Sequence, residues 1–106
     1  LEAAGAEVWV LPDAAAPGRV DLRELMRELA KREVNEVHVE AGPGLSGALF
    51  AAGLIDEMLF YYAPCLFGAG MGPAAVPLPA EPGAAYRWRL QSLDQIGGDF
   101  RVLLRR

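Results

Sequence analysis

The residues that could do chemistry cluster in one short stretch near the middle of the chain. Glu40 ends an apolar segment and is followed by Ala41-Gly42-Pro43-Gly44 and then by a helical pattern. The first amides of a helix have no partner within the helix, and the helix dipole adds positive potential at the same end. Gly42 and Gly44 leave that backbone bare, so a phosphate can approach it closely.

The predicted anion-binding segment uses main-chain donors. We expect the N–H groups of Gly44, Leu45 and Ser46 to be unpaired, because they lie in the first turn of the helix. Pro43 removes one donor but stiffens the approach to the helix. The spacing alone leaves two interpretations open, a phosphate site and a plain tight turn from strand to helix.

Glu40 is the second candidate for function. It shares one face of a predicted strand with Glu36 and His38. Its carboxylate either faces solvent at the edge of a sheet, or lies at the mouth of a cleft and accepts hydrogen bonds from a substrate amine or amide. His38 is interpreted as structural, because the sequence offers it no obvious nucleophile or metal partner.

Composition narrows the class of protein. The chain has 106 residues, of which 53% are hydrophobic, so it is long enough for one compact domain. Its formal charge of −4 argues against nucleic-acid or anionic-membrane partners, which require a basic face. One cysteine, Cys65, and one histidine exclude an internal disulfide and a usual four-ligand zinc site. We expect a cytoplasmic protein without a metal.

Helices and strands alternate in the first part of the predicted fold. Asp21 with Glu24 resembles a capping box, and the following apolar residues keep the spacing of one buried helical face. A Glu28–Arg32 pair is expected on the outer face of this helix. The other expected elements are a helix end at Leu1–Gly5, strands at Glu7–Leu11, Glu36–Glu40 and Asp56–Ala63, and a helix at Leu45–Ala52 that ends at Gly53.

The last part of the chain predicts a loop and a hairpin. Gly68–Gly83 is rich in Gly, Pro and Ala and is expected to be a loop. Tyr86–Asp94 alternates and is expected to pair with Phe100–Leu104 across Gly97-Gly98-Asp99. The order of elements predicts an α/β fold with a layered sheet, in which the first strands are parallel and an antiparallel hairpin is added late.

Four motifs in order resemble one enzyme family, the C-terminal reductase domain of the bifunctional riboflavin biosynthesis deaminase-reductase. They are Val39–Ala48, Gly53–Met58, Ala63–Gly68 and Ile96–Val102, and ordered matches extend over about residues 5 to 106. The resemblance implies a dihydrofolate-reductase-like fold and a cytoplasmic oxidoreductase that uses NADPH. It implies reduction of the ribosyl group of 5-amino-6-(5-phosphoribosylamino)uracil to the ribityl form.

The resemblance also implies roles for single residues. The glutamate at Glu40 contacts the substrate. The segment from the turn into the helix contacts the cofactor phosphates; its residues are Gly42, Pro43, Gly44, Leu45, Ser46, Gly47 and Ala48. No catalytic residue is assigned, because the cofactor carries the hydride and the protein orients and polarises the reactants. Ala41 departs from the glycine that is usual in the family, and Cys65 from a basic residue.

The chain is expected to be a partial domain. Residues 1–106 lack the upstream strands of such a reductase and the deaminase domain, so we expect a C-terminal fragment that is inactive without the rest of the enzyme. Two alternatives stay open at this point. One is a reductase of the same fold that acts on another pterin or pyrimidine, and the other is a non-catalytic dimerisation module. A homodimer is expected in either case, through the apolar strand Met58–Tyr62 and the hairpin.

Overall fold

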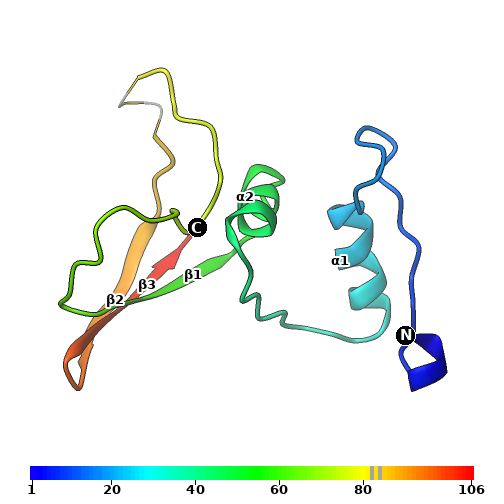
Figure 1. The fold of residues 1–106 in the computed structure, drawn as a ribbon, viewed down its shortest axis with the longest axis horizontal. Helices are drawn as coiled ribbons and strands as arrows, with labels where there is room; N and C mark the ends of the chain where they lie inside the picture. The colour runs from blue at the N-terminus through cyan, green and yellow to red at the C-terminus, as the bar shows by residue number, and fades with distance from the viewer. Residues whose placement is uncertain (82, 84) are drawn as a thin grey trace. The chain divides into compact units, whose positions relative to one another are not determined.

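The chain forms two compact units, Leu1–Val39 and Glu40–Arg106. The computed structural model describes residues 1–81, 83 and 85–106 (Figure 1). The anion-binding segment that the sequence predicts lies wholly in the second unit.

Helix α1, Leu22–Lys31, is the main element of the first unit. The carboxylate of Asp21 accepts hydrogen bonds from the N–H groups of Arg23 and Glu24, both at 2.9 Å. These two bonds satisfy donors that the first helical turn leaves without partners. The predicted helix and its cap are therefore confirmed. The predicted helix end at the start of the chain is also confirmed, as a short 3-10 turn, Glu2–Ala4, stopped by Gly5 at a φ of 81°.

Substitution of Asp21 by alanine tests the cap. We expect a loss of about 1 kcal/mol in the local stability of α1, since loss of an N-cap side chain costs about that much. Hydrogen exchange of the α1 amides in the full-length protein should then quicken about fivefold. Glu36→Ala removes an exposed carboxylate outside the helix and should leave these rates unchanged. Equal rates in the two variants would show that the cap contributes nothing.

Arg32 joins the end of α1 to the preceding chain. Its guanidinium lies 4.2 Å from the centre of the Trp9 ring and donates to Glu7 Oε2 at 2.7 Å. The Arg32 hydrogen bond, followed by that from Trp9, lowers the pKa of the Glu7 carboxyl. The predicted Glu28–Arg32 interaction is confirmed only as attraction at a distance: the pKa of Arg32 is raised mainly by its hydrogen bond to Glu7 and less by the charge of Glu28, whose direct ion pair is with Lys31. Spacing along a helix identifies only neighbours within that helix, whereas Glu7 lies 25 residues before Arg32 and contacts it in the folded chain.

Two predicted strands are not formed. Residues 7–11 and 36–40 are neither helix nor strand, and the only bridge near them joins Pro12 to Val20. The Leu11 carbonyl accepts from the Asp21 N–H at 2.8 Å beside this bridge, but a strand requires continued pairing with a neighbour, and neither segment has it among the described residues. Both segments have an apolar pattern typical of strands, but such a pattern does not by itself show that a pairing strand is present.

The second unit holds a helix and an antiparallel sheet of three strands (Figure 1). The helix is α2, Pro43–Ala51, and the strands are β1, Glu57–Tyr62, β2, Arg89–Ile96, and β3, Asp99–Arg105. Strand β3 lies between β1 and β2 and pairs antiparallel with both. The α/β class is confirmed, whereas the expected parallel strands are not present among the described residues.

The predicted hairpin is confirmed, with its first strand starting at Arg89 rather than Tyr86. Ile96 pairs with Asp99, so Gly97 and Gly98 alone make the turn. Gly97 has a φ of +62°, which a tight two-residue hairpin turn requires and glycine adopts without strain. The strand at Asp56–Ala63 is confirmed as β1. The described residues of the predicted loop Gly68–Gly83 contain no α-helix or β-strand, and Pro82 within it lies outside the described residues.

Ion pairs on one face of the sheet support its register. Arg101 lies opposite both Tyr61 and Asp94, and it donates to Asp94 Oδ2 at 2.8 Å. The pKa of the Asp94 carboxyl is lowered, first by this hydrogen bond and then by one from Ser92. Glu57 pairs with Arg105, which lies directly opposite it. Each pair fits one register only, since a slip by one residue turns every side chain to the other face.

Helix α2 ends as its sequence predicts. Gly53 has a φ of +68°, and the N–H of Leu54 donates to the Leu49 carbonyl at 3.0 Å, closing a Schellman-type end. Arg106 donates to the Gly53 carbonyl at 2.7 Å. Leu49 is 4% exposed and is the buried hydrophobic residue of the described chain. This small core anchors α2 and so positions its first turn.

Candidate functional site

The start of α2 leaves two amide donors without a partner. Gly42 is the N-cap residue, Pro43 the first helical residue, and no side chain caps this end. The N–H groups of Gly44 and Leu45 make no hydrogen bond within the described part of the chain. Ser46 differs from the sequence prediction, because its N–H donates to the Gly42 carbonyl at 3.2 Å. The first turn of α2 therefore presents two unpaired donors rather than three.

The open donors lie on an accessible surface. Gly42, Gly44 and Leu45 are exposed, and the first turn of α2 contains no acidic residue that would occupy the positive end of the dipole. A Cβ built at either glycine would meet nothing within 4 Å. Gly42 has a φ of −67°, and neither glycine is in the left-handed region. The fold alone therefore requires glycine at neither position, whereas the close approach of a ligand would.

Gly47 has a different environment from the other glycines of this segment. It is buried, and a Cβ built on it would lie 2.3 Å from the carbonyl oxygen of Ala75. The N–H of Ala75 donates to the Pro43 carbonyl at 2.8 Å. Gly47 thus contacts the loop that follows β1 and does not present its backbone to solvent. No local spacing in the chain indicates this contact, because Ala75 lies far along the sequence from Gly47.

The residues before the helix are arranged without strain. The described chain has no cis peptide bond, and Ala41 is not in the left-handed region, so alanine at the position of the family glycine fits this backbone. The Ser46 hydroxyl donates to the Ala41 carbonyl at 3.3 Å and fastens the turn to the helix. Glu40 is exposed and lies two residues before the N-cap. Glu40 and the open amides therefore belong to one short surface segment.

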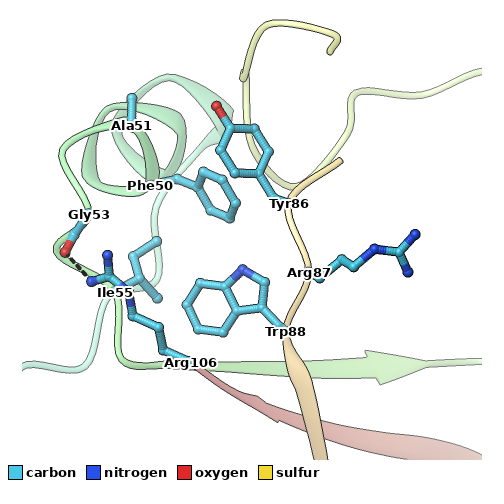
Figure 2. A pocket seen from close by; sticks show the side chains of 8 residues that line it. All are labelled: Phe50, Ala51, Gly53, Ile55, Tyr86, Arg87, Trp88 and Arg106. Carbon is cyan, nitrogen blue, oxygen red and sulfur yellow. Dashed lines mark hydrogen bonds between the residues drawn. The ribbon is translucent and has the colours of Figure 1, made fainter. Parts of the chain in front are cut away.

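A hollow of about 260 Å³ lies at the opposite end of α2 (Figure 2). Phe50 meets Tyr86 edge to face, with ring centres 4.6 Å apart, and Trp88 at 6.0 Å. Figure 2 shows Arg106 reaching back to the Gly53 carbonyl while the Arg87 side chain points away from the hollow. The sequence alone does not bring Phe50, Tyr86 and Trp88 together. They come from separate elements, so no local spacing could join them.

The described residues show neither a metal-binding cluster nor a helix that could span a membrane. They contain no group of three or more His, Cys, Asp or Glu side chains placed to hold a metal ion. None of the described helices combines the length and the apolar character needed to cross a bilayer.

Comparison with known proteins finds relatives over most of the chain. The model of the RibD C-terminal domain matches residues 2–102. Riboflavin biosynthesis protein RibD of Haemophilus influenzae is 45% identical over 82 residues, which are 76% of this chain and 22% of that protein. A Buchnera aphidicola protein named 5-amino-6-(5-phosphoribosylamino)uracil reductase is 31% identical over 87 residues, which are 81% of this chain and 42% of that protein.

Solved structures agree with these sequence matches. One form of Acinetobacter baumannii RibD superposes with a TM-score of 0.74 at 31% sequence identity, over 82% of this chain and 25% of that one. The chain therefore spans about a quarter of the solved relative's length. The residues matched by the family model include α2, β1, β2 and the first part of β3. This chain belongs to the family of RibD C-terminal domains.

Proposed function

We propose that this chain is the C-terminal part of a riboflavin-biosynthesis reductase. The complete enzyme would reduce the ribosyl group of 5-amino-6-(5-phosphoribosylamino)uracil to the ribityl group with NADPH. Membership of the RibD C-terminal family supports the proposal, as does the name of the Buchnera relative. Under this proposal the complete domain has the layered, dihydrofolate-reductase-like sheet, of which these residues supply the antiparallel part, and it works as a cytoplasmic homodimer.

The observation that carries the proposal is the bare start of α2. Gly42 and Gly44 are neither left-handed nor crowded, and Gly44 and Leu45 present amides without partners in the described chain. Two convergent N–H donors at the positive end of a helix suit a phosphate group of a dinucleotide. A plain turn would not need the bare backbone.

The residues of this chain bind and orient in the proposed reaction. NADPH, when bound, supplies the hydride. The Gly44 and Leu45 amides hold an anionic oxygen of the cofactor, and the exposed Gly42 lets that group approach. Glu40 accepts hydrogen bonds from amine or amide groups of the pyrimidine, since an ionised carboxylate is an acceptor only. Hydride transfer needs no protein nucleophile, so no catalytic residue is assigned in this chain.

Assay of the full-length enzyme tests this function. With 5-amino-6-(5-phosphoribosylamino)uracil we expect one NADPH to be oxidised for each ribityl product, with saturation by both reactants. A matched reaction with a pterin checks the alternative substrate class. Saturable NADPH binding without turnover of the pyrimidine, but with turnover of the pterin, would overturn the substrate assignment. Failure of NADPH to bind would overturn the cofactor assignment.

Glu40→Gln tests the proposed contact with substrate. We expect the KM for the pyrimidine to rise about tenfold, because a hydrogen bond to a charged group contributes about 1.5–3 kcal/mol. The KM for NADPH should stay within about twofold of the wild-type value, since the amides of α2 are untouched. Steady-state kinetics of the full-length enzyme give both constants. Glu36→Gln is the matched control, and equal kinetics for the two variants would contradict the assignment of Glu40.

A further inference from the structure

The loop after β1 contacts α2 at one peptide group that also belongs to the proposed cofactor site. Ala75 N–H donates to the Pro43 carbonyl oxygen at 2.8 Å. That carbonyl and the Gly44 N–H are the two ends of a single planar peptide, and they point in opposite directions. Ala75 therefore adds a bond from outside the helix to the peptide that presents Gly44 N–H to solvent.

Gly47 makes this contact sterically feasible. A Cβ at position 47 would lie 2.3 Å from the Ala75 oxygen and 2.8 Å from its carbonyl carbon. Real Cβ atoms do not lie this close to other heavy atoms. Because the contacted atoms belong to the Ala75 backbone, the loop would have to move. The glycine is thus required by Ala75 and not by the backbone angles, since Gly47 is in a regular helix.

We propose that Ala75 and Gly47 are positioning residues for the anion site at the start of α2. The proposal rests on the proposed function, because it assigns a role toward the NADPH phosphates. The Ala75 hydrogen bond restrains, from outside the helix, the peptide that carries the Gly44 N–H. It also polarises the Pro43–Gly44 peptide, because a hydrogen bond accepted at the carbonyl strengthens the N–H as a donor. The resemblance implied that Gly47 contacts the phosphates, but Gly47 is buried against Ala75, so we assign it this indirect role instead; neither residue touches the cofactor.

Gly47→Ala in the full-length enzyme tests this role. We expect the Kd for NADPH, measured by fluorescence titration, to rise at least tenfold. The KM for the pyrimidine should stay within twofold, because Glu40 precedes the displaced turn. Gly70→Ala is the matched control from the same loop, since a Cβ there meets nothing within 4 Å, and it should change neither constant. Equal weakening of both ligands by Gly47→Ala would mark a merely structural residue and overturn the proposal.

A measurement on the wild-type enzyme does not depend on folding of the variant. If Ala75 positions the cofactor site, bound NADPH must in turn stabilise the Ala75 contact, because coupling between sites is reciprocal. We expect saturating NADPH to slow hydrogen exchange of the Ala75 amide at least tenfold, with Gly70 unchanged. NADPH that binds without protecting Ala75 would overturn this inference and leave the proposed function standing. Absence of NADPH binding to the wild-type enzyme would overturn both.

Discussion

Replacing Gly44 with aspartate is expected to raise the Kd of the full-length enzyme for NADPH by about 30- to 100-fold. The new carboxylate would place a negative charge where the cofactor phosphate is proposed to lie. A hydrogen bond to a charged group contributes about 1.5–3 kcal/mol, and like-charge repulsion adds to its loss. Fluorescence titration with NADPH measures the change.

The same substitution should leave the fold intact. A Cβ at Gly44 meets nothing within 4 Å, and the residue is not in the left-handed region. An acidic side chain in the first turn also interacts favourably with the helix dipole. The Tm should therefore stay level or rise while NADPH affinity falls, which separates a lost ligand contact from a damaged structure.

Gly98→Asp is the matched control for this prediction. A Cβ built at Gly98 also meets nothing within 4 Å. The substitution therefore adds the same charge without crowding, but in the hairpin turn and not in α2. NADPH affinity should stay within twofold of the wild-type value. If Gly44→Asp and Gly98→Asp bind NADPH equally well, the cofactor phosphate does not lie at the start of α2.

Leu49→Ala is expected to produce the largest loss of stability. Leu49 is 4% exposed, and removing a buried leucine side chain typically costs about 2–5 kcal/mol from lost burial and the cavity left behind. Because its surroundings are half-buried and can partly collapse, we expect about 2–3 kcal/mol. A lower Tm and faster hydrogen exchange in α2 and β1 of the full-length protein would report this change.

Leu45→Ala in the same helix is the control for Leu49. Leu45 is 47% exposed, so its removal should cost less than about 1 kcal/mol. The two variants differ in burial but not in residue type or secondary structure. Equal stability of the two variants would mean that Leu49 does not anchor α2.

The elements predicted from the sequence with success are those whose cause is local. Asp21 caps α1 through bonds to residues two and three positions later, and Gly97 supplies the backbone angle of the hairpin turn. Such interactions can be inferred from spacing. The segments 7–11 and 36–40 have the right apolar pattern but no partner strand in the described chain, so the predicted parallel strands fail for a non-local reason.

In the candidate site, too, features with a local cause were predictable and features with a non-local cause were not. The bare amides of Gly44 and Leu45 follow from the position of the helix start, which the sequence indicates. The bond that occupies Ser46 N–H was missed, because it depends on α2 beginning at Pro43 rather than Leu45. The contact of Gly47 with Ala75 was also missed, because a loop far along the chain returns to the helix. Spacing alone could not distinguish this packing glycine from the exposed ones.

The most direct test of the central claim follows the amide signals of the helix start during an NADPH titration. In the full-length enzyme, with glycine and leucine labelled selectively, we expect the Gly44 and Leu45 amide resonances to move furthest. Both should saturate at the Kd found by fluorescence, since these two donors take up the anion. Saturable NADPH binding with both resonances unmoved, while other amides shift, would contradict a cofactor phosphate at the start of α2.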